Sequence, residues 1–115
     1  MGVIFELTPH SNGIWKEKVL HSFSGTDGMF PAGLIFDHKG NLYGGTDRGG
    51  RAGEGTVFKL APGSKGEWRE EILHSFRKHP GALPSGALIF DDAGNLYGTT
   101  EGEYPSYGSV FEITP

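Results

Sequence analysis

The stretch GTVFKLAP at residues 55–62 determines how this chain folds, because related stretches occur three times. It is preceded by GVIFELTP at residues 2–9 and followed by GSVFEITP at residues 108–115. Both steps span 53 residues, and the pair Trp15 and Trp68 keeps the same offset. A period near 50 residues is typical of repeat architectures, in which one unit buries its apolar face only by stacking on the next.

The repeat predicts a single module over residues 1–115. Repeat 1 covers residues 2–54, repeat 2 covers residues 55–107, and a partial third repeat covers residues 108–115. Stacked repeats generally need about three or more units for stability. We therefore expect this chain to complete its fold with other chains.

Composition favours a small domain of short strands and many turns. The 115 residues include 20 Gly and 7 Pro, with 36% hydrophobic and 12% aromatic residues. A net charge of −4 without a basic cluster argues against nucleic-acid binding. The lack of cysteine excludes disulfides and thiolate chemistry.

Targeting signals give two expectations about location. No apolar run approaches the roughly 20 residues that a membrane helix needs, so we expect no membrane insertion. The chain starts directly on a repeat strand, which argues against a signal peptide and leaves its location unassigned. It is either a cytoplasmic protein or an excised or designed piece of a longer chain.

Each repeat is predicted to contain four short strands. Residues 57–60 alternate apolar and polar side chains and stop at a proline, where a strand ladder is difficult to continue. Residues 68–76 also alternate, and this pattern places Trp68 and Phe76 on one face. Residues 34–36 are apolar on both faces, as in a buried strand, and a further short strand begins at residue 42. We expect an all-β fold, because helical periodicity is missing.

A hairpin turn is predicted between two of these strands in each repeat. The aspartate can accept backbone hydrogen bonds across the turn, and the glycine supplies the positive φ that closes it. A calcium loop would need more carboxylates at alternating positions, so a structural turn is favoured. The turn residues are Asp37, Gly40, Asn41, Asp91, Gly94 and Asn95.

The repeated histidines and tryptophans are interpreted as packing residues. His21 and His74 share a strand face with aromatic residues, which favours hydrogen-bonded core histidines over a base or a metal ligand. A metal would need further nitrogen or oxygen ligands, and the repeat offers only its turn aspartates. Trp15 and Trp68 could stack on a sugar, but their periodicity favours packing. Without known catalytic or phosphate motifs, we predict no catalytic residues, metal or cofactor.

The combined motif string resembles a known family. The pattern G-x-V-F-x-L-x-P, then W…LHSF, then LIFD…GNLYGTT is similar to the choice-of-anchor tandem repeats of the GloVer type. The resemblance covers nearly the whole chain twice. It implies a β-propeller-like fold and a secreted or cell-surface origin, and it assigns no reaction.

Propellers with a similar turn allow the strands to be assigned to four-stranded antiparallel blades. Residues 34–37 then form inner strand A, followed by B at 42–46, C at 57–60 and D at 68–76. The chain holds C-D, A-B-C-D and A-B-C, or about two blades plus one strand. Three or four chains would close a homo-oligomeric ring of six or eight blades. The two terminal C strands would compete for one place.

The loops that differ between repeats are expected on one rim of this ring. They are residues 24–31 against 77–84, and 45–54 against 99–107. Loops on a rigid scaffold commonly carry binding residues. The candidates for ligand binding are Asp27, Asp47, Arg48, Arg51, Arg77, His79, Glu101, Tyr104 and Tyr107.

Three functions compete for this chain. The leading hypothesis is a non-enzymatic propeller module that self-assembles and binds a glycan or a protein surface through the loop rim. The alternative is a purely structural spacer or self-assembling fragment with no ligand. A lyase or hydrolase in the propeller channel comes third, because its inner strands lack convergent acid and base residues.

Overall fold

A computed structural model of the protein describes residues 1–78, 81–105 and 107–115. This part of the chain is all β-strand and loop, and none of it forms a helix capable of crossing a membrane. The strands are β1 (Val3–Pro9), β2 (Trp15–Ser22), β3 (Met29–Phe36), β4 (Leu42–Arg48), β5 (Thr56–Pro62), β6 (Trp68–Ser75), β7 (Pro84–Phe90), β8 (Leu96–Thr100) and β9 (Ser109–Ile113).

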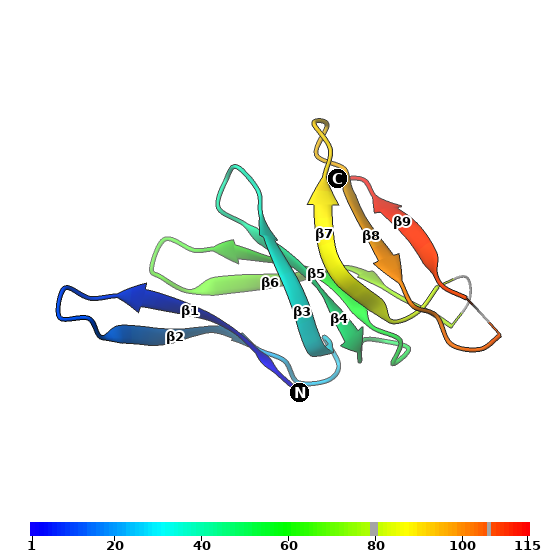
Figure 1. Ribbon diagram of the computed structural model, residues 1–115, viewed down its shortest axis with the longest axis horizontal. Helices are drawn as coiled ribbons and strands as arrows, with labels where there is room; N and C mark the ends of the chain where they lie inside the picture. The colour runs from blue at the N-terminus through cyan, green and yellow to red at the C-terminus, as the bar shows by residue number, and fades with distance from the viewer. Residues whose placement is uncertain (79–80, 106) are drawn as a thin grey trace.

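The strands form three antiparallel sheets that lie side by side along the molecule (Figure 1). The N-terminal sheet pairs β1 with β2, the central sheet has the order β3-β4-β5-β6, and the C-terminal sheet has the order β7-β8-β9. This order confirms the predicted all-β class and the predicted grouping of the strands into sets of two, four and three. The sheets of this single chain spread outward and do not enclose a ring (Figure 1).

The hairpin between β3 and β4 is closed by a single carboxylate. Asp37 Oδ1 accepts hydrogen bonds from the backbone N–H groups of Lys39 and Asn41, at 2.8 and 2.9 Å. Its Oδ2 accepts from the Asn41 side chain at 2.7 Å and the Tyr43 hydroxyl at 3.1 Å. Gly40 has φ of 83°, a conformation that glycine adopts without steric cost.

The second hairpin, between β7 and β8, repeats this arrangement. Asp91 accepts hydrogen bonds from the Ala93 and Asn95 backbone N–H groups, the Asn95 side chain and the Tyr97 hydroxyl. Gly94 has φ of 87°. The turn is therefore built into the repeat, and both carboxylate oxygens serve to close it.

A β-bulge interrupts the outer strand of each repeat and corrects the predicted strand faces. In the central sheet, Val57 pairs with His74 and Phe58 pairs with Ile72, so Leu73 is the extra residue. The N-terminal sheet has the same register shift between Ile4 and Phe5. The prediction that Trp68 and Phe76 share a face is wrong, because they pack into different clusters. The extra residue reverses the alternation between them.

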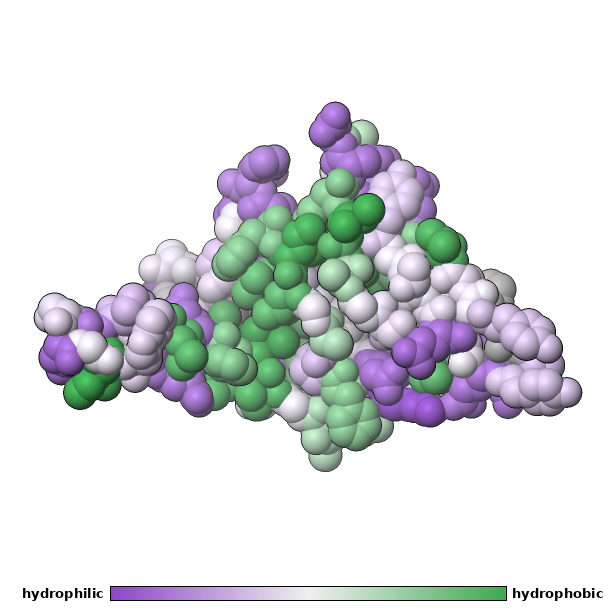
Figure 2. All heavy atoms as spheres, viewed as in Figure 1, coloured by the Kyte–Doolittle hydropathy of each residue, from purple (hydrophilic) through white to green (hydrophobic). Residues whose placement is uncertain are grey.

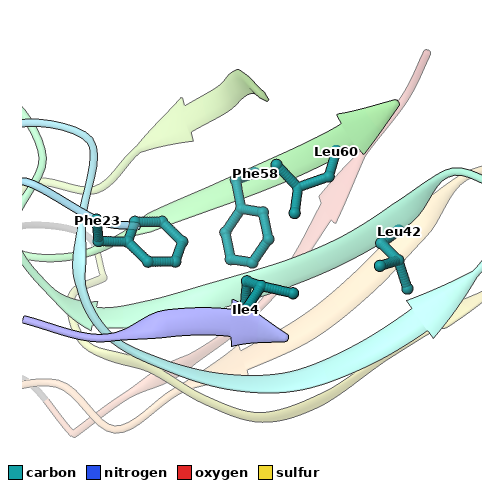
Figure 3. Close-up of a cluster of buried hydrophobic side chains, with 5 residues drawn as sticks. All are labelled: Ile4, Phe23, Leu42, Phe58 and Leu60. Atoms are coloured by element: carbon teal, nitrogen blue, oxygen red, sulfur yellow. The ribbon is translucent and has the colours of Figure 1, made fainter. Parts of the chain in front are cut away.

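Two hydrophobic clusters join the three sheets. The first lies between the N-terminal and central sheets, with Phe23 facing Phe58 (Figure 3). The second lies between the central and C-terminal sheets, where Phe76 faces Phe111. The two aromatic pairs have nearly equal centroid distances of 5.2 and 5.1 Å and similar edge-on geometry. The members of the first cluster are Ile4, Phe23, Leu42, Phe58 and Leu60, and those of the second are Val57, Phe76, Leu88 and Leu96.

The first strands of the central and C-terminal sheets, β3 and β7, approach closely at paired glycines. A Cβ atom on Gly33 would lie 3.0 Å from the Gly86 carbonyl oxygen, so a side chain there would require β7 to shift by a few tenths of an ångström. Gly33 and Gly86 also have φ values of 62° and 80° and mark the register shifts of their strands. The sheets therefore converge at these strands and diverge toward β6 and β9.

Candidate functional site

The loops that differ between the repeats form one connected edge of the molecule. Gly50 N–H donates to the Gly25 carbonyl at 3.0 Å, which joins the β4–β5 loop to the β2–β3 loop. Leu83 N–H donates to the Glu54 carbonyl at 2.9 Å, and Gly102 N–H donates to Ala82 at 3.1 Å. These bonds link the loops in a series that follows the lower edge of the molecule in Figure 1. We call this edge the loop rim.

Buried hydroxyl pairs anchor the loop rim to the sheets. The Thr46 and Thr56 hydroxyls lie 2.8 Å apart, and Thr56 donates to the Asp27 carbonyl at 3.0 Å. Both threonines are fully buried. Thr100 and Ser109 form the same 2.8 Å pair in the C-terminal sheet. Each satisfied pair holds the two strand ends from which a rim loop departs.

A histidine and two carboxylates meet where the N-terminal sheet contacts the central sheet. His21 Nε2 on β2 lies 2.9 Å from Asp27 Oδ2 and 3.5 Å from Glu70 Oε1 on β6. All three side chains are less than one-fifth exposed. The expectation that only turn aspartates would lie near the repeated histidines is wrong here. The β2–β3 loop folds back over His21, and the next sheet brings Glu70 to it.

The two carboxyl groups of this cluster have opposite pKa shifts. Burial would raise the pKa of Asp27, but hydrogen bonds from the Ser24 N–H, His21 and the Ser24 hydroxyl hold that pKa below its usual value. Burial raises the pKa of Glu70, with the Asp27 charge acting in the same direction and His21 opposing it. Asp27 is thus the stable anion of the pair and the natural hydrogen-bond acceptor for His21.

The same cluster has the donor atoms that a divalent metal would need. One imidazole nitrogen and two carboxylate oxygens lie within 4.8 Å of one another. Three such donors plus a water would suit zinc. The hydrogen bond between His21 and Asp27 accounts for the positions of these two side chains. Glu70 Oε1 lies 3.5 Å from His21 and has no hydrogen-bond partner among the described residues. We interpret the cluster as a polar joint between two sheets.

The second repeat does not complete an equivalent joint within this chain. His74 corresponds to His21, but it is exposed, which corrects the expectation of a core histidine at both positions. Its ring packs edge-on against Phe76, at a centroid distance of 4.7 Å. Among the described residues the C-terminal sheet has the order β7-β8-β9, without a counterpart of the fourth strand that β6 provides in the central sheet.

Two of the predicted ligand-binding residues share a hollow on the loop rim. Arg51 from the β4–β5 loop and Arg77 after β6 both line a depression of about 470 Å³. Both arginines are exposed. The remaining lining residues are Thr26, Ala52, Ile72, Leu73, His74 and Ser75. Two guanidinium groups beside hydroxyl and imidazole groups can bind a carboxylate, a phosphate or the hydroxyls of a sugar.

Tyr104 and Tyr107 form a separate exposed feature. They lie on the β8–β9 loop, with side chains 85% and 89% exposed. Large aromatic groups this accessible are suited to stacking against a sugar or packing against a protein surface. They do not line the arginine hollow.

The remaining candidates are more enclosed or lie elsewhere. Arg48 Nη2 forms an ion pair with Glu103 Oε1 at 2.7 Å, and this pair ties β4 to the β8–β9 loop. Asp47 is half-buried at the end of β4, and Glu101 is exposed where β8 ends. Asp27 is held by His21, as described above. His79 lies outside the described residues.

Sequence reasoning missed Glu70 and Glu103 as site residues. Glu70 follows the same 53-residue offset as Glu17, and this offset marks it as a repeated position. Its proximity to His21 depends on how two sheets pack, which the spacing alone does not give. Glu103 has no such signal, because the β8–β9 loop differs from the β4–β5 loop.

Fold and repeat spacing together define a tandem-repeat protein of the all-β class. The family model described as the Gloeobacter/Verrucomicrobia repeat matches residues 1–115, and the chain belongs to this family. The resemblance to GloVer-type repeats is therefore confirmed. Neither the curated proteins nor the solved structures contain a match to this chain.

Proposed function

We propose that this protein is a non-enzymatic repeat module that joins further copies of itself in a β-propeller ring. The main supporting observation is that, within the described residues, the two outer sheets have two and three strands against four in the central sheet, and both expose large apolar side chains. Phe5, Leu7 and Trp15 of the N-terminal sheet are 52%, 48% and 60% exposed. At the far end, Ile89 and Val110 of the C-terminal sheet are 63% and 78% exposed.

Free energy favours covering these faces. Burying one Val, Leu, Ile or Phe side chain stabilises a protein by about 1.5–3 kcal/mol. The two exposed faces belong to opposite ends of the molecule, so the contact is head-to-tail and repeats from copy to copy. A ring satisfies every such contact and also covers the strand edges, whereas an open chain of copies leaves two ends exposed.

Self-assembly of this kind makes thermal stability depend on protein concentration. Only the folded state has the contacts between copies, so mass action raises the unfolding midpoint as concentration increases. We expect circular dichroism melts to shift upward steadily across a dilution series. An unfolding midpoint that stays constant over the whole series would contradict the proposal.

A second function, carried by the loop rim, is binding of a glycan or a protein surface. Its support is that Arg51 and Arg77 line one hollow and that Tyr104 and Tyr107 are highly exposed. Several copies of a weak site on one ring would bind a multivalent surface by avidity.

A glycan array and a pull-down with the intact protein test this second function. Any ligand found should lose affinity when Arg51, Arg77, Tyr104 and Tyr107 are replaced by alanine. A matched control replaces His10 in the β1–β2 turn and Lys65 in the β5–β6 turn, which are exposed on the side of the molecule away from the loop rim. Failure to recover any ligand in both assays would favour the structural spacer.

A further inference from the structure

We propose that the inner strands β7 and β8 of one copy insert beside β1 and β2 of a second copy. The product is a shared four-stranded sheet with the order β7-β8-β1-β2, in which β1 takes the place of β9. This inference rests on the proposed self-assembly, and it names the surfaces that meet. The evidence comes from the internal repeat. The interface between neighbouring sheets occurs twice in one chain, once occupied by the inner strands of a sheet and once without them.

The open form is an apolar groove between the N-terminal and central sheets. The groove has a volume of about 330 Å³ and is lined almost entirely by apolar side chains. Figure 2 shows apolar residues gathered in a band across the middle of the molecule, where β3 lies in Figure 1. The lining residues are Phe5, Glu6, Leu20, Leu34, Phe36, Leu42 and Trp68.

The filled form lies one sheet further along. Leu34 and Phe36 of the central sheet are 45% and 63% exposed. Their counterparts in the C-terminal sheet are protected, with Leu88 only 5% exposed and Phe90 half-buried. The protection comes from the inner strands of the central sheet. Tyr43 packs edge-on against Phe90 at 5.0 Å.

The N-terminal sheet already supplies half of the equivalent interface. Ile4 and Phe23 pack onto the central sheet, just as Val57 and Phe76 pack onto the C-terminal sheet. The central sheet also contributes Ile35 and Tyr43 from its inner strands, and this is the half that the N-terminal sheet lacks. The groove is therefore open where two inner strands would lie.

The C-terminal sheet of another copy carries the matching residues. By the repeat, Ile89 and Tyr97 correspond to Ile35 and Tyr43. Ile89 is 63% exposed, whereas Ile35 is half-buried. Docking β7 and β8 into the groove gives Ile89 the apolar environment that Ile35 already has. A second copy of this chain is thus the occupant that the groove fits.

β1 and β9 would compete for the same place beside β8 in the shared sheet, and the extent of their present pairing indicates which one takes it. β1 pairs with β2 over seven residue pairs, whereas β9 pairs with β8 over five. The segment just before β1 is also held by a 2.8 Å hydrogen bond from Phe30 N–H to the Met1 carbonyl. Releasing β9 therefore costs less than releasing β1. Phe5 of β1 then takes the position of Phe111 across from Gly98, as Phe58 lies across from Gly44.

The polar joint provides an independent match. His21 and Glu70 meet between the outer strands of neighbouring sheets at 3.5 Å. The repeat counterparts of this pair are His74 and Glu17, and both are exposed in the single chain. The shared sheet lies next to the central sheet of the first copy, and β2 of the second copy is its outer strand. His74 of one copy then faces Glu17 of the next, and the joint is reproduced.

Cross-linking between two singly substituted chains tests this arrangement. One chain carries His74→Cys and the other Glu17→Cys, and they are mixed and treated with a short bis-maleimide. We expect a covalent dimer of the two different chains on a denaturing gel. In the matched control, Lys39→Cys on an opposite-rim turn replaces Glu17→Cys, and this mixture should give no dimer. Equal yields from the two mixtures, or none from either, would overturn the proposal.

A second pair of variants separates this inference from self-assembly itself. Ile89→Asp puts a charge into the proposed interface, and we expect it to reduce the protein to single chains in solution. Ile14→Asp changes an equally exposed residue, 62% against 63%, in the β1–β2 turn outside the interface, and should leave assembly unchanged. If Ile89→Asp assembles like the wild type, the shared sheet is wrong, while self-assembly still stands. If the wild type is itself a single chain, both proposals fail.

Discussion

Asp37 closes its hairpin with both carboxylate oxygens, and its acidity reflects these bonds. Burial opposes ionisation, but hydrogen bonds from Asn41, Lys39 and Tyr43 lower the pKa of Asp37 to about 2. Burial and the bond to Asp37 in turn raise the pKa of Tyr43 to about 12. The hydrogen bonds favour the charged carboxylate, so they stabilise the folded state only while Asp37 is ionised.

Replacing Asp37 by asparagine should destabilise the protein by about 1 kcal/mol at neutral pH, the range of a single net hydrogen bond. The pKa of Asp37 in the folded state lies below that of an ordinary aspartate, so this contribution is present above about pH 4 and is lost as pH falls toward 2. Urea titrations of the wild type and Asp37→Asn should therefore converge at low pH. Asp92→Asn, on the exposed turn, is the control. A difference that stays constant down to pH 2 would contradict this account.

Phe58 and Phe5 occupy the same repeat position in different surroundings. Phe58 is fully buried between sheets, whereas Phe5 is 52% exposed. Truncating a buried phenylalanine costs about 3–5 kcal/mol. Phe58→Ala should therefore cost far more than Phe5→Ala in urea unfolding of dilute, single-chain protein. Similar losses of unfolding free energy for the two variants would mean that Phe5 is buried in solution, and this would contradict the account.

Strands and turns were largely predictable from the sequence, because each depends on local pattern. Alternating side chains identified β5 and β6, and the Asp37 turn was recognised from its aspartate and glycine. The bulge at Leu73 was not predicted, since an extra residue leaves no mark on composition. It reversed the expected faces of Trp68 and Phe76.

Contacts between elements were less predictable than the elements themselves. The contact between His21 and Glu70 depends on how two sheets pack together, and the repeat period carries no information on this packing. The hollow of Arg51 and Arg77 likewise forms where loops from two connections meet. The sequence therefore predicts most of the residues on the loop rim, but it does not predict which of them lie close together.

Deletion of residues 108–115 tests the role of β9 as an element. The shared sheet uses β1 in its place, so removing β9 removes a competitor. We expect the truncated protein to assemble at least as tightly as the full chain, with a lower midpoint concentration in sedimentation. Loss of assembly on truncation would mean that β9 is the strand in use.

At the scale of the whole molecule, the single chain is more extended than a compact domain. Its radius of gyration is 15.0 Å, whereas a compact chain of this length has about 13 Å. Its principal extents are 53, 32 and 24 Å. The three sheets spread from the closely approaching strands β3 and β7, and this shape leaves both outer sheets with uncovered faces (Figure 1).

The central claim is that further copies of this chain cover those faces. Molar mass in solution by light scattering tests it most directly, because it requires no knowledge of ligand or partner. We predict a discrete species of three or four times the 12.4 kDa chain mass, corresponding to six or eight blades. A mass of 12.4 kDa at every concentration measured would contradict the account.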